Sequence, residues 1–253
     1  MDYSLQKASI WKRAAAWLLD AILVCILATG FGFLLSSLLS YDSYNRTLND
    51  GYSHYEELYG VSFEISYEEH EALSSDARQN WDNAYNALIG DEDVMYAYSM
   101  VINLTMIIVT IGILLGVLVL EFAVPLFLGN GQTLGKKMFG ICLMRTDGVR
   151  INSLQLLTRT LLGKYTVETM IPMLILLMIY WGTMGVTGTA VLFALFFGQL
   201  ACVLFTRTNA AIHDLMAGTI VVDYASQTIF KSTEDLIAYQ KKVAADRAAR
   251  APY

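Results

Sequence analysis

Two carboxylates stand inside long apolar segments, where a charged side chain is costly. Asp20 follows Arg13 in IWKRAAAWLLDAILVCILATGFGFLLSSLL, and Glu121 interrupts VTIGILLGVLVLEFAVPLFL. An aspartate at the centre of a membrane costs about 2.5–3.5 kcal/mol on insertion scales, so each carboxylate needs a partner or a watery pocket. Arg13 and Asp20 are seven residues apart. They therefore lie two turns apart on one helix face, which makes Arg13 a candidate partner of Asp20.

Further charged residues stand near the ends of the apolar segments. Glu168 opens the third segment, and Asp214 follows the fourth. Carboxylates in such places mark ion paths or proton relays, and ion-pair networks that orient helices use the same residue types. We therefore predict either an ion or proton site or a structural ion-pair network, and both interpretations stay open. The residues of this site are Arg13, Asp20, Glu121, Arg159, Glu168 and Asp214.

No catalytic or metal-binding pattern accompanies these charges. Cys25, Cys142 and Cys202 are far apart and form no CxxC, so neither a disulfide framework nor a zinc site is indicated. His213 and Asp214 are neighbours in sequence and do not share a helix face, so they are not a metal pair. We expect Asp214 to cap a helix or to form a salt bridge near Arg13 or the loop cations. The sequence contains neither HExxH nor GxSxG. We predict that the protein is not an enzyme and has no catalytic residue, metal or cofactor.

The segment FLGNGQTLGKKMFG has only a superficial likeness to a phosphate-binding loop. Asn130 stands where the first glycine of GxxxxGK belongs, and Lys137 replaces the Ser or Thr that follows the lysine. We expect the glycines of this segment to shape a turn, and Lys136 and Lys137 to contact lipid phosphates.

The composition is that of a membrane protein. Hydrophobic residues make up 55% and charged residues 16% of the 253 residues, whereas soluble domains carry about 25% charged residues. Crossing the hydrocarbon takes about 20 apolar residues. The first apolar segment is longer than the apolar region of a cleaved signal peptide, so we interpret it as a retained span. The predicted spans are residues 14–39, 96–128, 165–181 and 189–205.

The distribution of charge predicts the orientation in the membrane. Residues 41–93 hold 13 of the 23 acidic residues, but only Arg46 and Arg78 of the 17 Lys and Arg residues. Cytoplasmic loops are rich in Lys and Arg. Both termini are therefore predicted to be cytoplasmic, and the acidic insert is predicted to lie outside.

We predict an all-α membrane protein with four transmembrane helices and a small cytoplasmic β-hairpin. The hairpin is MFGICLMRTDGVRI, with a turn at Asp147-Gly148, and GTIVVDY predicts a third strand. NSLQLLTRTLLGK, capped by Asn152 or Ser153, predicts a helix at the membrane face. Ser232 starts a solvated tail helix. The predicted segments are 1–40 (flank and first span), 41–94 (acidic insert), 95–128 (second span), 129–164 (hairpin and interfacial helix), 165–206 (third and fourth spans) and 207–253 (tail).

Taken together, these motifs resemble the RDD family of multi-pass bacterial membrane proteins. That family is named for an arginine at the start of the first span, an aspartate within it and a further aspartate. The counterparts are Arg13 and Asp20 in KRAAAWLLD, and Asp214 in AAIHDLMAGTIVV. LLTRTLLGK supplies the arginine that usually follows the second span, Arg159. The segment GQTLGKKMFG resembles the family's GxTxGK motif, here Gly131, Thr133, Gly135 and Lys136.

The resemblance implies a multi-pass protein of the bacterial cytoplasmic membrane and suggests transport. Some members of the family are linked to sodium/proton exchange, and others look like assembly partners of membrane complexes. Our first hypothesis is a cation or proton-coupled transporter in which Asp20 and Glu121 bind the ion and Arg13 tunes their pKa. The alternative is a non-transporting scaffold, assembly or quality-control partner. The expected partners are lipid, monovalent cations or protons, and either further copies of the chain or another membrane protein, but no nucleic acid.

Overall fold

The computed structural model describes residues 5–180 and 182–250. Residues 1–4 of the predicted flank, Trp181 at the predicted end of the third span, and residues 251–253 of the predicted tail lie outside the described residues. The chain divides into two compact units. We call Thr29–Gly112 the insert unit, and the described parts of Met1–Ala28 and Ile113–Tyr253 the core unit. Each unit is described by itself.

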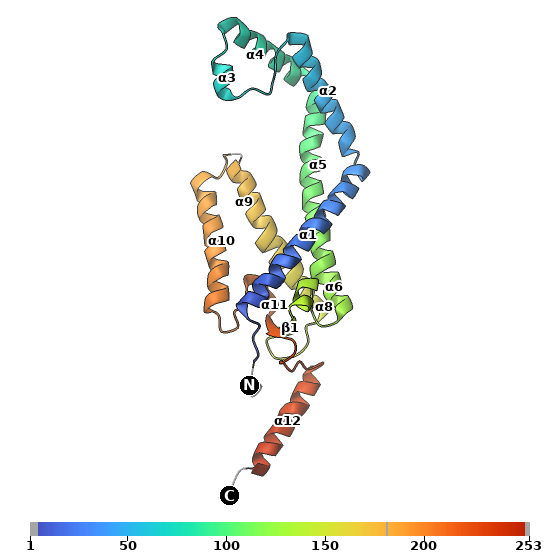
Figure 1. Cartoon of the computed structure of the whole chain (residues 1–253), viewed down its shortest axis with the longest axis vertical. Coiled ribbons are helices and arrows are strands. Elements are labelled where there is room, and N and C mark those ends of the chain that lie inside the picture. Colours follow the sequence, from blue (N-terminus) through green and yellow to red (C-terminus); the bar gives the residue numbers. More distant parts are fainter. Residues whose placement is uncertain (1–4, 181, 251–253) are drawn as a thin grey trace. The chain divides into compact units, whose positions relative to one another are not determined.

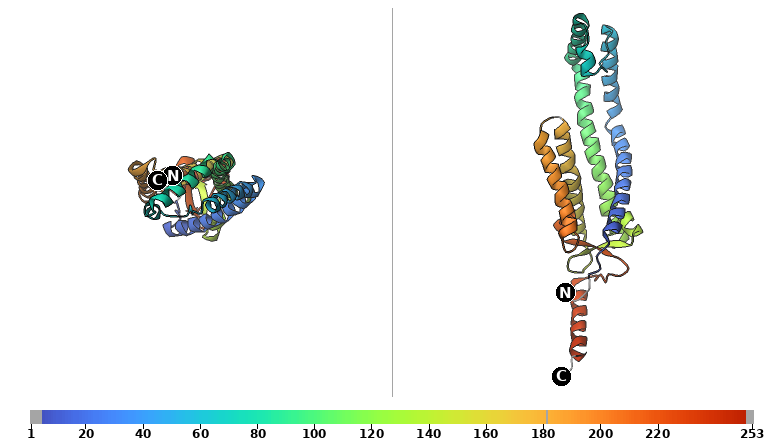
Figure 2. Two further views of the ribbon diagram at one scale, coloured as in Figure 1. Left: turned by 90° about the horizontal axis from the view of Figure 1, so that it is seen from above. Right: turned by 60° about the vertical axis from the view of Figure 1, so that its left-hand side comes forward.

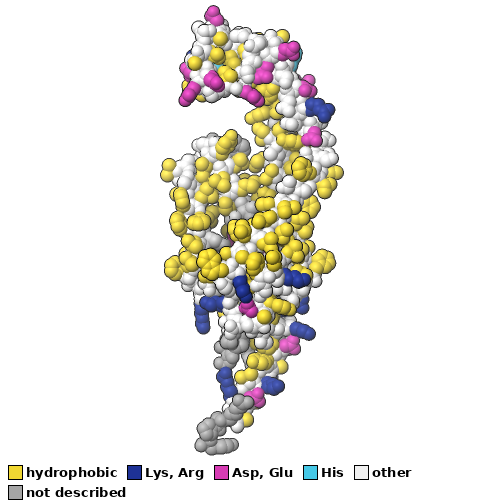
Figure 3. Space-filling model, in the orientation of Figure 1, with side chains coloured by type: hydrophobic (Ala, Val, Ile, Leu, Met, Phe, Trp, Pro, Cys, Tyr) yellow, Lys and Arg dark blue, Asp and Glu magenta, His cyan; other side chains and the backbone are white. Residues whose placement is uncertain are grey.

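Four helical segments are long and apolar enough to cross a membrane, as predicted: Ile10–Leu38, Glu92–Leu128, Ser153–Tyr180 and Gly185–Phe205. Their elements are α1 (Ile10–Leu38); α5 (Glu92–Val117), η1 (Leu118–Ala123) and α6 (Val124–Leu128); α8 (Ser153–Thr158), η2 (Arg159–Met170) and α9 (Ile171–Tyr180); and α10 (Gly185–Phe205). In the core unit, hydrophobic side chains cover the visible helix surface, and Lys and Arg side chains gather at one end of it (Figure 3).

The third of these segments begins as predicted but runs further than predicted. The Asn152 side chain caps α8 by accepting a hydrogen bond from Gln155 N at 2.7 Å. The helix then continues through η2 into α9, because i→i+5 hydrogen bonds carry the backbone across the segment. The predicted interfacial helix and the predicted third span are therefore a single helix. Its last part, α9, packs beside α10 (Figure 2).

The core unit also holds a two-stranded antiparallel sheet (Figure 1). Strand β1 (Ile141–Arg145) pairs with β2 (Thr219–Asp223), and Leu143 lies opposite Val221. The predicted hairpin is shorter than expected, because the segment after the Asp147-Gly148 turn pairs with β1 only at the bridge between Met144 and Arg150. The first four residues of both strands are buried. GTIVVDY, predicted as a third strand, is therefore the main partner of β1.

The remaining core-unit elements join the sheet to the helices. They are α7 (Leu134–Met138), α11 (Ile212–Ala217) and α12 (Thr233–Arg250). A hydrophobic cluster that includes Ala16, Leu143, Leu156 and Val221 connects α1, both strands and α8. The Ser232 hydroxyl accepts a hydrogen bond from Asp235 N at 3.2 Å and caps α12, as predicted.

The insert unit holds three further helices, α2 (Tyr41–Tyr59), α3 (Tyr67–Glu71) and α4 (Ser75–Gly90). The helical character predicted for residues 66–90 is confirmed, with Ser66 and Ser74 as N-caps. Phe63 is at the centre of an aromatic cluster, with ring centroids 5.7 Å from Trp81 and 5.8 Å from Tyr52. These aromatic contacts hold the segment after α2 against α2 and α4.

Candidate functional site

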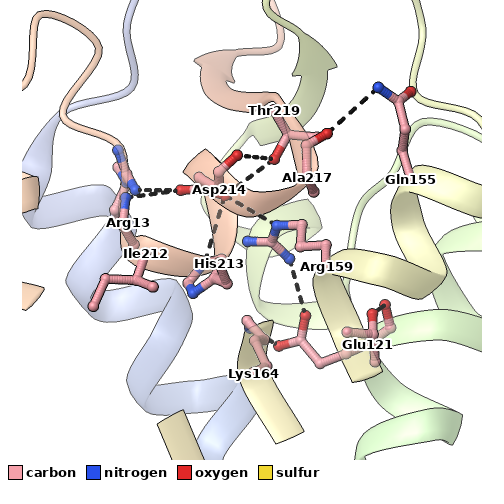
Figure 4. Close-up of polar contacts among 12 residues, drawn as sticks. Arg13, Glu121, Gln155, Arg159, Lys164, Ile212, His213, Asp214, Ala217 and Thr219 are labelled. Atoms are coloured by element: carbon pink, nitrogen blue, oxygen red, sulfur yellow. Dashed lines mark hydrogen bonds and ion pairs between the residues drawn. The ribbon is translucent and has the colours of Figure 1, made fainter. Parts of the chain in front are cut away.

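Asp214 lies between two arginines from different helices (Figure 4). Arg13 Nη2 of α1 is 3.0 Å from Asp214 Oδ2, and Arg159 Nε of η2 is 3.0 Å from Asp214 Oδ1. Arg13 also donates to the Asn209 carbonyl, and Ala211 N donates to Asp214 Oδ2 at 3.3 Å. Asp214 is completely buried. One carboxylate therefore joins the first and third candidate spans to α11.

Glu121 is the second centre of the network. Its side chain forms ion pairs with Lys164, with Lys136 at 3.4 Å and with Arg159 at 3.6 Å. The main chain of the same residue is also held, since Thr160 Oγ1 donates to the Glu121 carbonyl at 3.0 Å. Glu121 is 3% exposed and Arg159 is 1% exposed. Arg159 thus links Glu121 to Asp214.

Asp20 is held by the loop that follows the second candidate span. Its side chain accepts hydrogen bonds from Gly135 N at 2.8 Å and from the Thr133 hydroxyl. Lys136 Nζ lies 3.7 Å from Asp20 Oδ2, so the same ammonium faces Asp20 and Glu121. Asp20 is 2% exposed. The contacts of Asp20 therefore depend on α7 and its N-cap residue. Thr133, Gly135 and Lys136 bring the hydroxyl, the backbone N–H and the ammonium group to α1.

A side branch of the network contains a histidine. His213 Nδ1 lies 2.6 Å from Glu168 Oε1, and its Nε2 lies 3.4 Å from Asp214 Oδ1. Gln199 Nε2 of α10 donates to Glu168 Oε1 at 2.9 Å, and its Oε1 accepts from Ile212 N at 3.0 Å. All four candidate spans therefore contribute a side chain to one connected set of polar groups.

Both π-helical segments coincide with the charges of the network. Glu121 lies in η1, and Arg159, Lys164 and Glu168 lie in η2. At 3.6 residues per turn, the nine residues from Arg159 to Glu168 make two and a half turns, which would place the two on opposite sides of an α-helix. A π-helix has more residues per turn, so Arg159, Lys164 and Glu168 all reach members of the same network: Glu121 and Asp214 for Arg159, Glu121 for Lys164, and His213 for Glu168. Such segments are frequent at functional sites.

Two glycines allow the network to close. A Cβ on Gly163 of η2 would lie 2.4 Å from His213 Cβ and 2.7 Å from His213 Cα. A Cβ on Gly135 would lie 2.4 Å from the Ala16 carbonyl oxygen and 2.8 Å from Asp20 Oδ1. Both distances to backbone atoms are shorter than real Cβ contacts allow. The close approach of α11 to η2 and of α7 to α1 is thus possible only because Gly163 and Gly135 have no side chain.

The charges of this set balance. Four carboxylates (Asp20, Glu121, Glu168 and Asp214) face four cations (Arg13, Lys136, Arg159 and Lys164). We call these eight residues and His213 the charged cluster. Burial lowers the pKa of His213 below 6.5, which keeps the imidazole neutral at pH 7. Burial alone would raise the pKa of Asp214, but the positive charges of Arg159 and Arg13 and the hydrogen bond from Arg159 outweigh it and lower that pKa.

The structure brings together all six residues predicted for the ion or ion-pair site. The predicted pairing of Arg13 with Asp20 is wrong, however, because Arg13 binds Asp214 and Asp20 binds the α7 loop. Of the loop motif, Thr133, Gly135 and Lys136 contact the charged cluster. Gly131 instead adopts a left-handed turn conformation (φ 62°) beside Leu143 and Ile151.

Sequence reasoning missed or misplaced four members of the site. Lys136 was expected at lipid phosphates, yet it is 6% exposed and paired with two carboxylates, whereas Lys137 is exposed. Lys164, His213 and Gln199 were not in the predicted site. The register of the π-helix brings Lys164 and Glu168 inward, and a period of 3.6 residues gives no signal of it.

A comparison with known families assigns most of the chain to one family. The model of the RDD family matches residues 7–218. The chain belongs to the RDD family. No curated protein and no solved structure matches it significantly. The region of the RDD match includes every member of the charged cluster, from Arg13 to Asp214.

Proposed function

We propose that this RDD protein exchanges monovalent cations against protons across the bacterial cytoplasmic membrane, with both termini in the cytoplasm and the acidic insert outside. The observation that supports this is the charged cluster, in which carboxylates and cations of the first three candidate spans, α7 and α11 form one connected set, which Gln199 of the fourth candidate span joins through Glu168. Ionisable residues within membrane spans are functional sites by default. Lys and Arg side chains gather at one end of the hydrophobic surface of the core unit (Figure 3). Because cytoplasmic loops are rich in Lys and Arg, this supports the placement of both termini in the cytoplasm.

The balance of charge supports exchange over simple uptake. An extra cation would leave one buried positive charge without a partner, and an uncompensated buried charge costs about 3–5 kcal/mol. A cation therefore enters at low cost only when a proton leaves the charged cluster. Exchange of one monovalent cation for one proton keeps the cluster neutral. Because four spans leave little room for a pathway, we expect a homo-oligomer.

The test is flux through the purified protein in lipid vesicles. Lumenal pH is followed with a trapped dye after a sodium or potassium gradient is imposed. We expect a cation-driven pH change in the wild type and at least a tenfold slower change in Asp20→Asn, since the neutral side chain removes one of the charges that a cation needs. Glu57→Gln, in the exposed face of α2, is the matched control. A folded wild type without flux under either gradient contradicts the proposal.

A second candidate function is a non-transporting scaffold or assembly partner of another membrane protein. It is favoured by the pairing of every carboxylate in the charged cluster and by the exposed surface of α12. Deletion of residues 233–253 should then abolish co-purification of a membrane partner, while Asp20→Asn leaves the partner bound. In neither candidate function is the chain an enzyme.

A further inference from the structure

The short helix α7 has the reverse of the usual amphipathic pattern. Gly135 and Lys136 are buried, whereas Leu134, Lys137 and Met138 are exposed. Leu134 is 44% exposed and Met138 is 73% exposed. The exposed residues follow the first of them by three and four positions, so they share one face of the helix, which we call the outer face of α7. A helix that borders water usually has its apolar residues inside and its charged residues outside.

The charged cluster explains why the inner side of α7 is polar. Gly135 N donates to Asp20 Oδ1 at 2.8 Å, and Lys136 Nζ lies 3.4 Å from Glu121 Oε2. The inner side therefore binds α1 and η1. The Lys137 ammonium, in contrast, forms no ion pair or hydrogen bond with any residue that the structure describes. The outer face thus combines an available positive charge with apolar side chains that the protein leaves uncovered.

The position of α7 beside α1 places its outer face at membrane depth. A Cβ on Gly135 would lie 2.4 Å from the Ala16 carbonyl oxygen. Ala16 is about 9 Å along the helix from the start of α1, a candidate membrane span. The adjacent Trp17 is 60% exposed, and Trp is enriched where lipid headgroups meet acyl chains. The outer face of α7 is therefore continuous with the lipid-facing surface of α1.

We propose that the outer face of α7 binds an anionic phospholipid, with the lipid phosphate at Lys137 and an acyl chain against Leu134 and Met138. A lysine at this depth extends its ammonium toward the headgroups while its apolar stem stays among the chains. Charge complementarity favours an anionic headgroup such as phosphatidylglycerol, because the choline ammonium of phosphatidylcholine cancels the phosphate charge.

The bound lipid would act on the charged cluster through α7. The helix that meets the lipid on its outer face holds Asp20 through Gly135 on its inner side. A lipid that fixes α7 therefore also stabilises the contacts of Asp20. This inference goes beyond the proposed exchange function and does not depend on it.

The test is thermal unfolding of the full-length protein in a non-ionic detergent, with phosphatidylglycerol or phosphatidylcholine added at equal concentration. We expect phosphatidylglycerol to raise the melting temperature of the wild type by about 2–4 °C more than phosphatidylcholine does. Lys137→Gln should bind phosphatidylglycerol about fivefold more weakly and lose this preference. Met138→Gln should also bind it more weakly but keep the preference. Lys241→Gln, at an exposed position of α12, changes the net charge equally and should behave as the wild type.

Glycerol 3-phosphate separates a lipid site from a site for free phosphate, and we expect it to leave the wild type unchanged. Stabilisation by glycerol 3-phosphate equal to that by phosphatidylglycerol overturns the proposal. Equal effects of the two lipids on the wild type, or equal losses in Lys137→Gln and Lys241→Gln, also overturn it. Should a variant fail to fold, the two lipids on the wild type decide alone.

Amide hydrogen exchange tests the link from the lipid to Asp20. Phosphatidylglycerol should slow exchange in the peptide that contains Gly135 in the wild type, but not in Lys137→Gln. Exchange that the lipid leaves unchanged in the wild type would remove the link between the outer face of α7 and the charged cluster.

Discussion

The core unit and the insert unit use the same acidic residue types in opposite ways. In the core unit, Asp20, Glu121 and Asp214 are at most 3% exposed, and each faces at least one cation. In the insert unit, the exposed Glu69 closes a capping box with Ser66, and Asp91 accepts hydrogen bonds from the backbone at the start of α5. Burial therefore decides whether a carboxylate needs a cation or only a local hydrogen bond.

The largest difference between the units should appear when one carboxylate is neutralised in each. Asp214→Asn leaves Arg13 and Arg159 without their shared charge, and breaking a buried ion pair costs about 3–5 kcal/mol. Glu57→Gln in the exposed face of α2 should change the free energy of unfolding by less than about 0.5 kcal/mol. Chemical denaturation in detergent measures both variants. Equal losses of unfolding free energy in the two variants would mean that burial does not decide how much a carboxylate contributes to stability.

A smaller difference should follow from adding one methyl group. Gly163→Ala pushes a Cβ against His213, and overpacking of this kind costs about 1–3 kcal/mol. At Gly90 of α4 nothing lies within 4 Å of an added Cβ, so Gly90→Ala should be neutral or slightly stabilising. The two melting temperatures test this pair. A Gly163→Ala protein as stable as Gly90→Ala would contradict the close approach of α11 to η2.

The smallest expected effect is a dependence of stability on pH. Because burial lowers the pKa of His213, the unfolded chain takes up a proton below about pH 6.5 that the folded chain does not. Stability should therefore be full above pH 6.5 and fall by up to about 1.4 kcal/mol per pH unit as the pH drops toward the folded pKa.

This pH slope can be assigned to one residue with two variants. His213→Gln should flatten the slope between pH 7 and pH 5, and His54→Gln, at an exposed position of α2, should leave it unchanged. Unfolding free energies measured at each pH provide the readout. An identical slope in His213→Gln and the wild type would assign the loss to other groups.

The residue types of the charged cluster and a salt bridge of Asp214 near Arg13 could be predicted from the sequence, but the partners of Asp20 and Glu121 could not. The cost of a charge in an apolar segment marks Asp20 and Glu121 as residues that need partners. Which partner each one receives depends on contacts between distant segments, such as Arg13 with Asp214 and Asp20 with Gly135. Sequence separation along one helix favoured Arg13 for Asp20, and the tertiary structure overrides that preference.

The same limit explains the remaining differences in the fold. Four apolar segments of sufficient length were predicted, and the structure has four. The local hairpin was overestimated because an Asp-Gly turn is a strong hairpin signal. The predicted third strand, β2, is the main partner of β1 and reaches it only after the fourth candidate span has returned the chain to the sheet. The π-helices were missed because no local residue pattern announces a change from i→i+4 to i→i+5 bonding.

The π-helical register of η2 also bears on how the protein can change state. If the backbone hydrogen bonds of this segment moved from i→i+5 to i→i+4, Glu168 would turn by roughly half a circle away from Arg159. Glu168 would then leave His213 and Gln199, its present partners. A change of backbone hydrogen-bond partners within η2 would thus open the charged cluster.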